Sequence, residues 1–494
     1  MADTDLQEIS FSENSRPNLR RIWRCGAVLA GALILTWPSL YNGFPLLYPD
    51  SMAYLDAGRM VLRVLFQHGV PPQSYLRSLI YGLSILPLHW NVTPWGIVVL
   101  NALVTSYIIW LVVRSILPRR TVMNYLALIV PLSLFTSLGW FVGWVMPDIL
   151  GPVLYLSIYL LVFAYEDLSR AELFAVILIA WWSVCSHITH LPLAAGLCVF
   201  LITILAFEHQ LTRGRLRAIG GVAMIILASL AAQIVINTVY YGKPSLNGQR
   251  PPFLMARVIA DGPGRSYLQQ QCGKVQLSIC ARIDQLSDDS NQVLWAKKGL
   301  WKTSSPAQQQ QLRTEETPFI LGTLREYPKR MLRIAVRNFW WQLRSLHSSS
   351  RPDPFVLETI DQVLPGARPR FLRSRQAQRS LHDAFFASVQ GWTVMASVVL
   401  VTAWIVLTLR EQRSLRLAGL AAVILFSVCA NAAVTGILSD VEGRYQSRVI
   451  WLLPLLAVVL VLTWFDRRSR GSTVRESALV TVPQEDILLV DTRS

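Results

Sequence analysis

Two Pro-Asp dipeptides stand out among the residues that could do chemistry. Asp50 follows Pro49, Asp148 follows Pro147, and each acid comes just after an apolar run ends. A carboxylate at the edge of an apolar segment can act as a general base or bind a cation. Asp is also a favoured helix N-cap residue, so capping is the alternative for both. Because the same dipeptide occurs in the same kind of place twice, we favour the interpretation that the two acids lie close together in the fold.

A polar stripe at helical spacing follows the first of these acids. Its members are Asp56, Arg59, Arg63 and Gln67. Asp56 and Arg59 are candidates for substrate binding. The alternative is that Asp56 pairs with Arg59 or Arg63 on a solvated helix face.

The segment 186–192, Ser-His-Ile-Thr-His-Leu-Pro, interrupts an apolar stretch, 174–207, that is 34 residues long. That stretch is too long for one membrane span, so the break is expected at the membrane surface. His187 and His190 share a face if this break is helical. They could ligate a metal, donate to a phosphate or cap the turn. No third ligand is obvious, so no cofactor is assigned and a divalent metal stays an open alternative.

A cationic cluster lies close to the last apolar run. It consists of Arg444, Tyr445 and Arg448, which follow Glu442. An Arg pair suits a lipid phosphate or pyrophosphate, because a guanidinium binds such groups through two parallel hydrogen bonds. Anchoring to lipid head groups is the alternative. Acids, cations and aromatic rings at one membrane edge are what a reaction on a lipid-linked phosphate needs.

The elements that carry these residues follow from composition. The chain has 494 residues, of which 53% are hydrophobic and 15% are charged, and its formal net charge is +16. This composition excludes a disordered chain and argues against an ordinary soluble enzyme. Much of the Arg excess lies beside apolar runs, where membrane orientation explains it. A soluble nucleic-acid binder is excluded by the apolar runs, and no nucleic-acid partner is expected.

The apolar runs predict an all-α polytopic membrane protein with about ten transmembrane helices. The expected spans are 22–41, 94–116, 122–143, 149–165, 173–187, 190–207, 218–241, 386–409, 417–437 and 449–465. If the run 74–90 is an outer interfacial helix and not a span, the Lys and Arg residues of nearly every loop lie on the cytoplasmic side, as the positive-inside rule requires. Both termini are then cytoplasmic, as a basic N-terminus over 1–21 and a tail over 466–494.

Two large outer pieces divide the chain. The first outer loop, 42–93, belongs to a transmembrane module over 22–241 and is expected to hold interfacial helices. The second piece, 242–385, lies between spans seven and eight and is expected to be mixed but mainly helical. The transmembrane helices of 386–465 follow it.

Within the second outer piece, residues 329–346 predict an amphipathic helix that returns to the bilayer surface. Cys272 and Cys280 could form a disulfide there in an oxidising compartment, and the pairing is left open. The other four Cys are expected to be small apolar packing residues.

This layout resembles the GT-C superfamily of glycosyltransferases that use polyprenyl-phosphate sugars. The superfamily includes protein O-mannosyltransferases and the aminoarabinose transferases of lipid A. The segments that carry the resemblance are Tyr48-Pro-Asp-Ser51, Pro71–Tyr81 with Val99-Leu-Asn101, Met146-Pro-Asp148, the 187–192 break and Arg444-Tyr445. At that break relatives carry a Lys-Gly-Pro-like turn, whereas this chain has His and lacks the Gly.

The resemblance implies an inverting transfer of a sugar from a polyprenyl phosphate, on the outer face of a bacterial inner membrane. Asp50 would deprotonate the acceptor, and Asp148 would position the acceptor or the base. The residues that would hold the phosphate are His187, His190, Arg444 and Arg448. Expected partners are the polyprenyl-phosphate sugar donor, membrane lipids and an acceptor that is a lipid, a glycan or a protein.

Two other functions fit the same residues. A transporter or flippase of lipid-linked envelope precursors would use the same basic outer face. An envelope assembly partner would use 242–385 as a docking region, and the two Pro-Asp acids would then be helix caps.

Overall fold

The chain is helical almost throughout in the computed structural model. The residues described are 17–67, 77–246, 248–346, 353–407 and 414–480, without the side chains of 17–21 and 469–480. In these ranges no strand forms, and β-pairing is limited to two isolated bridges. The all-α fold class is therefore confirmed. Most of the predicted N-terminus 1–21, the end of the predicted tail and residues 71–76 of the family-like segment lie outside the described residues.

The helices of the first half of the chain are α1 (Pro17–Leu35), α2 (Trp37–Asn42), α3 (Pro49–Gln67), α4 (Leu79–His89), α5 (Trp95–Ile116), α6 (Thr121–Phe135), α7 (Leu138–Gly143), the 3-10 turn η1 (Pro147–Ile149), α8 (Leu150–Phe163), η2 (Tyr165–Asp167), α9 (Arg170–Ser186), α10 (His190–Phe207) and α11 (Arg213–Tyr241). Those of the second half are α12 (Phe253–Ala260), α13 (Pro263–Gln271), η3 (Ser278–Gln285), α14 (Ser290–Trp295), α15 (Pro306–Glu326), α16 (Pro328–Arg344), α17 (Pro354–Val363), α18 (Arg368–Leu372), α19 (Asp383–Leu407), α20 (Leu415–Leu438), α21 (Gly443–Ile450) and α22 (Leu452–Val480).

Seven helical segments in the described ranges are long and apolar enough to cross a membrane. They are Ile22–Asn42, Trp95–Ile116, His190–Phe207, Arg213–Tyr241, Asp383–Leu407, Leu415–Leu438 and Gly443–Arg468. The expected spans 122–143, 149–165 and 173–187 correspond to α6 with α7, α8 and α9, which are shorter than the roughly 20 residues that a perpendicular span needs. The seven long helices indicate a multi-pass membrane protein, and the count of ten stays a prediction.

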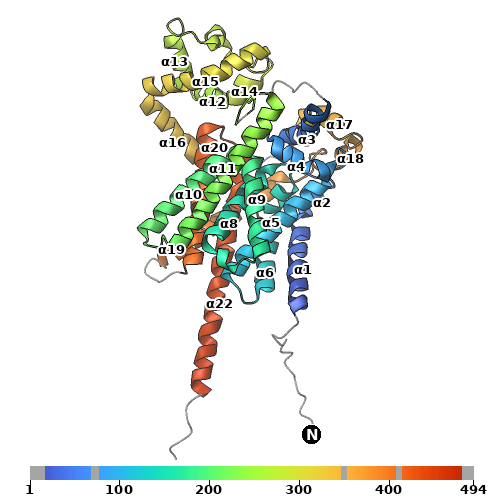
Figure 1. Cartoon of the computed structure of the whole chain (residues 1–494), viewed down its shortest axis with the longest axis vertical. Helices are drawn as coiled ribbons and strands as arrows, with labels where there is room; N and C mark the ends of the chain where they lie inside the picture. The colour runs from blue at the N-terminus through green and yellow to red at the C-terminus, as the bar shows by residue number, and fades with distance from the viewer. Residues whose placement is uncertain (1–16, 68–76, 247, 347–352, 408–413, 481–494) are drawn as a thin grey trace, which may run out of the picture.

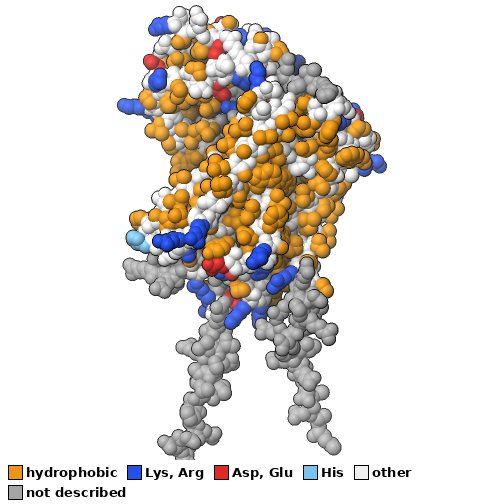
Figure 2. All heavy atoms as spheres, in the orientation of Figure 1, with side chains coloured by type: hydrophobic (Ala, Val, Ile, Leu, Met, Phe, Trp, Pro, Cys, Tyr) orange, Lys and Arg blue, Asp and Glu red, His pale blue; other side chains and the backbone are white. Residues whose placement is uncertain are grey.

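The long helices form one body with a distinct helical unit at one end. In Figure 1, α12 to α15 lie above the body, and α3, α4 and α17 lie beside them at the same upper end. The start of α1 and the end of α22 lie at the opposite, lower end. Figure 2 shows hydrophobic side chains covering the flank of the body. Leu33, Phe174 and Val399, for example, are 68%, 68% and 65% exposed. So large an apolar surface is the one expected of helices that face lipid.

The upper unit has a hydrophobic core of its own. Met255, Ile259, Trp301 and Phe319 are buried together there. Cys272 and Cys280 are joined by a disulfide, which resolves the pairing that the sequence left open. Helices also predominate among the described residues between α11 and α19.

Helix α16 connects this unit to the body, and its position matches the predicted amphipathic helix. One face is buried against α20 through Asn338 and Gln342, while Leu332 and Trp340 are exposed on the other. The contact is close: a Cβ added at Gly436 of α20 would lie 2.8 Å from the Asn338 carbonyl oxygen. Glycine is therefore required for this approach of the two backbones.

Candidate active site

The two Pro-Asp motifs are brought together by a short piece of parallel backbone pairing. The Leu46 amide donates to the Gly143 carbonyl, and the Val145 amide donates to the Leu46 carbonyl, both at 3.0 Å. Leu46 and Trp144 thus form an isolated parallel bridge. A larger residue at position 143 would be too close to Ser39, because a Cβ there would lie 2.6 Å from the Ser39 hydroxyl oxygen.

The pairing explains why the acids converge. Asp50 follows Leu46 by four residues, and Asp148 follows Trp144 by four residues. The two segments leave the bridge side by side in the same direction, and each then enters a helical turn at its Pro-Asp, α3 for Asp50 and η1 for Asp148. The predicted convergence of the two carboxylates therefore has a backbone cause.

Arg444, in the first turn of α21, lies between the two acids. Its Nη2 is 3.4 Å from Asp50 Oδ2, and its Nη1 is 3.7 Å from Asp148 Oδ2. The residues that precede each Pro-Asp also contact this guanidinium. Its Cζ is 4.3 Å from the centre of the Tyr48 ring, and its Nη1 is 3.5 Å from the Met146 sulfur. One guanidinium thus bridges both motifs.

Arg448 lies one helical turn after Arg444 and holds the second acid. Its Nη1 is 3.4 Å from Asp148 Oδ1, and its Nη2 donates to Asn431 Oδ1 at 2.9 Å. Arg448 is 1% exposed, so this pair is shielded from water. Tyr445 lies between the two Arg residues in sequence, and its ring centre is 5.1 Å from Arg444 Cζ and 5.6 Å from Arg448 Cζ.

The first acid has a second cationic partner. Arg77, just before α4, forms an ion pair with Asp50 through Nη2 and Oδ1. Burial of the carboxyl group raises the pKa of Asp50, but the guanidinium groups of Arg77 and Arg444 outweigh this effect and hold the pKa below its usual value. Asp50 is therefore ionised at neutral pH.

These five charged side chains form what we call the Asp–Arg cluster: Asp50, Asp148, Arg77, Arg444 and Arg448. Three guanidinium groups face two carboxylates, so the cluster carries one net positive charge. In the described part of the chain, the hydrogen bonds of both acids are to guanidinium groups, not to helix N-terminal amides. This geometry favours an anion-binding cluster over a pair of helix caps.

The two histidines lie at the edge of the cluster. His187 directly follows α9, His190 begins α10, and their ring centres are 5.4 Å apart. His190 Nδ1 bonds the Ser183 carbonyl at 2.6 Å, while its buried Nε2 has no partner among the described residues. A Cβ at Gly151, in the first turn of α8, would lie 3.2 Å from that Nε2. The break is not helical at His187, which is extended, so the two residues do not share a helix face; their rings are neighbours beside α8, the helix that follows Asp148.

A metal site is not assembled here. The described residues contain no group of three or more His, Cys, Asp or Glu side chains placed to hold a metal ion. His187 Nδ1 lies 2.8 Å from the Thr189 hydroxyl oxygen, a local contact in the turn.

Asp56 and Arg59 lie apart from the cluster in their contacts. Arg59 Nη2 is 2.7 Å from Asp56 Oδ1, and it also donates to the Gln362 carbonyl at 3.1 Å. This is the ion pair that the sequence offered as the alternative to substrate binding. Their contacts in the described structure do not reach Asp50.

Two segments of the region 242–385 hold the cluster in place. Gln376 donates to the Leu47 carbonyl at 2.8 Å and accepts from the Leu47 amide at 3.0 Å. Gln342 of α16 donates to the Glu442 carbonyl and accepts from the Glu442 amide, both at 2.9 Å. The first contact lies three residues before Asp50 and the second two residues before Arg444, so the region supports both sides of the cluster.

Replacing Gln342 with Ala should lower the free energy of unfolding by about 2–3 kcal/mol, because two backbone groups of Glu442 lose their partners. Chemical unfolding of the purified protein in detergent measures the change. Gln310→Ala, at an exposed site on α15, should change it by less than about 0.5 kcal/mol. Equal effects of the two substitutions would contradict the role given to Gln342.

Comparison with protein-family models, with curated proteins and with solved structures finds no match to this chain. The case for function therefore depends on the residues themselves.

Two residues of this site were missed by the sequence analysis, although each carried a signal. Arg77 lies in the apolar run 74–90, and Asn431 lies in the middle of an apolar helix. A charged or amide side chain in such a place usually has a polar partner. The sequence could not say which partner, because the partners are 27 and 17 residues away.

Proposed function

We propose that this protein is a membrane glycosyltransferase that moves a sugar from a polyprenyl-phosphate donor to an acceptor. The observation that carries the proposal is the placing of Asp50 and Asp148 on one guanidinium, Arg444, within a cluster of net positive charge. A group-transfer enzyme needs a base for the nucleophile and cations for the leaving group. The cluster supplies both within one site.

The chemistry follows from these contacts. Asp50 takes the proton from an acceptor hydroxyl or amine as that atom attacks the anomeric carbon of the sugar. The bond from that carbon to the phosphate oxygen breaks, and its electron pair leaves with the phosphate. Arg444 and Arg448 stabilise the charge that grows on the phosphate. His187 and His190 form hydrogen bonds at the edge of the phosphate group. Attack from the side opposite the phosphate inverts the anomeric centre.

The ion pairs also suggest how the base becomes active. In the described structure Arg77 and Arg444 stabilise the ionised form of Asp50 and so weaken it as a base. A donor phosphate would compete with the carboxylate for these guanidinium groups. As the phosphate draws them away, the pKa of Asp50 would rise toward its usual value and its basicity would recover. Donor binding thus primes acceptor deprotonation.

The orientation follows from the charges and the disulfide. Basic residues flank the apolar segments at the end opposite the cluster, as expected of a cytoplasmic face. The Cys272–Cys280 disulfide belongs to the helical unit at the cluster end, and disulfides persist in oxidising compartments. We therefore assign the cluster to the outer face of a bacterial inner membrane, with both termini in the cytoplasm.

The test is a turnover assay on the purified protein in lipid vesicles with a panel of radiolabelled polyprenyl-phosphate sugars. Release of free polyprenyl phosphate together with sugar transfer is the expected result. Movement of the intact sugar lipid between leaflets, without cleavage, would favour the transporter or flippase alternative over the glycosyltransferase. Donor binding with neither cleavage nor movement would favour the assembly-partner alternative.

A further inference from the structure

A cavity near the lower end of the body lies far from the Asp–Arg cluster. It is open, has a volume of about 1470 Å³, and is walled by α1, the α5–α6 turn, the start of α9 and the start of α20. Arg416 lines it from the first turn of α20, whereas Asn431 and the cluster lie toward the other end of that helix. The separation of Arg416 and Asn431 along this helix corresponds to about 22 Å, so the cavity and the cluster are separate sites.

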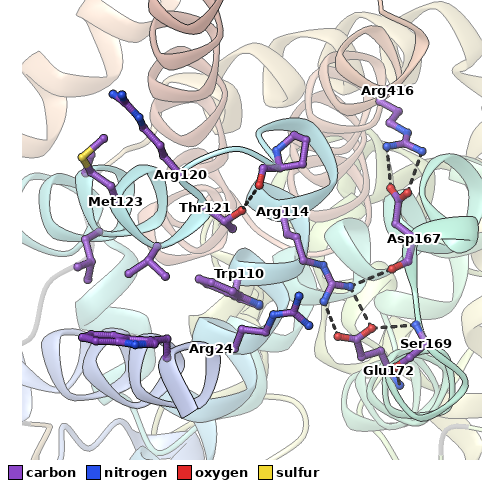
Figure 3. Close-up of a pocket in the computed structure, with 15 residues that line it drawn as sticks. Arg24, Trp110, Arg114, Arg120, Thr121, Met123, Asp167, Ser169, Glu172 and Arg416 are labelled. Carbon is purple, nitrogen blue, oxygen red and sulfur yellow. Dashed lines mark hydrogen bonds and ion pairs between the residues drawn. The ribbon is translucent and has the colours of Figure 1, made fainter. Parts of the chain in front are cut away.

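Two of the four Arg side chains in this cavity are neutralised by acids. Arg114 bonds Glu172 at 2.5 and 3.0 Å and the Asp167 carbonyl at 3.1 Å. Arg416 bonds the Asp167 carboxylate at 2.7 Å. Figure 3 shows these two pairs side by side on one wall. Both acids of the cavity are therefore already paired.

The other two Arg side chains have no carboxylate within ion-pair distance among the described residues. They are Arg24 of α1 and Arg120, which precedes α6, and both are exposed. In Figure 3 the Arg24 guanidinium extends toward the Arg114–Glu172 pair. Four cations and two acids leave the cavity with two net positive charges, which suits a phosphate group.

Apolar side chains adjoin these cations. Trp23 and Met123 line the same cavity and are 63% and 55% exposed. Leu126 and Trp110 extend this apolar wall. A soluble anion would gain nothing from such a surface, whereas an acyl chain would bury it at about 25 cal/mol per Å². Basic pockets between membrane helices on the cytoplasmic side are suited to anionic phospholipids.

We propose that this cavity is a binding site for an anionic phospholipid of the inner leaflet, attracted by the exposed cations Arg24 and Arg120, with its acyl chains against Trp23 and Met123. The site is independent of the proposed transfer reaction. The bound lipid joins the lower ends of α1, α6 and α20, which are distant in sequence. It is therefore expected to stabilise the packing of these helices.

The test measures the affinity of delipidated full-length protein in detergent for phosphatidylglycerol and for phosphatidylcholine with the same acyl chains, by native mass spectrometry. Wild type should bind phosphatidylglycerol at least about tenfold more tightly. This preference should fall to less than about threefold in Arg24→Gln/Arg120→Gln. The matched control, Arg119→Gln/Arg213→Gln, removes the same charge at exposed positions outside the cavity and should keep the preference.

Three results would overturn the proposal. The first is that the preference for phosphatidylglycerol survives in the double variant. The second is that the control variant loses the preference equally, which would indicate general charge attraction. Inorganic phosphate at 10 mM could displace phosphatidylglycerol, which would indicate a soluble anion. Arg120→Gln alone is the second variant should the double variant fail to fold, since Arg120 is exposed and its loss should still weaken the preference.

Discussion

Replacing Asp50 with Asn should lower sugar transfer by about 10²- to 10⁴-fold, the usual contribution of a general base. Asn has nearly the shape of Asp and can still accept hydrogen bonds from Arg77 and Arg444, so the fold should persist. It cannot take up a proton from the acceptor. The measurement is the initial rate of sugar transfer with saturating donor, beside the binding affinity for the donor.

Asp56→Asn is the matched control, because it is the same substitution on the same helix. Asp56 pairs with Arg59 and has no contact with the cluster in the described structure, so transfer should fall by less than about threefold. Full activity of Asp50→Asn, or equal losses in the two variants, would exclude Asp50 as the base. Loss of donor binding without loss of the chemical rate would make Asp50 a positioning residue.

Replacing Arg448 with Met should lower the free energy of unfolding by about 3–5 kcal/mol. Met fills a similar volume but carries no charge, so Asp148 loses the partner at 3.4 Å and Asn431 loses its donor. Both acceptors are buried, and water cannot replace the guanidinium at such a site without rearrangement. Chemical unfolding in detergent, followed by circular dichroism, measures the change.

Arg368→Met serves as the control for that loss. Arg368 pairs with Asp361 at 3.1 Å, but both side chains are 48% exposed, and a surface pair contributes about 0–1 kcal/mol. The double variant Arg448→Met/Asp148→Asn should regain part of the lost stability, because it removes a buried carboxylate whose remaining ion pair is the longer one to Arg444, at 3.7 Å. If Arg448→Met cost no more than Arg368→Met, the buried pair would not stabilise the fold.

Apolar periodicity and length were sufficient to predict the long helices but not the short ones. The expected span 122–143 carries no charged residue, yet the chain breaks between α6 and α7 at Thr136 and Ser137. Thr136 bonds the Leu132 carbonyl, and the Ser137 hydroxyl donates to the Ser447 carbonyl at 2.6 Å. The second partner is 310 residues away, so the break depends on a tertiary contact that hydropathy does not encode.

The site was predictable in its acids and only partly in its cations. The repeated Pro-Asp and the Arg pair before the last apolar run were local signals, and the structure brings Asp50, Asp148, Arg444 and Arg448 together. Arg77, in the run 74–90, was not among the predicted site residues. Its pairing with Asp50 depends on how α3 and α4 pack against each other, which no sequence pattern specified.

The bridge between Leu46 and Trp144 has a consequence for which sequence changes the molecule tolerates. Each acid lies four residues after its bridge residue. The length of the backbone between bridge and acid therefore matters more than the identity of the side chains in it. Asp50 lies in the first turn of α3 and Asp148 in η1, so inserting or deleting one residue between bridge and acid would turn the carboxylate away from Arg444. Related chains that keep this site should therefore vary in composition between bridge and acid but not in length.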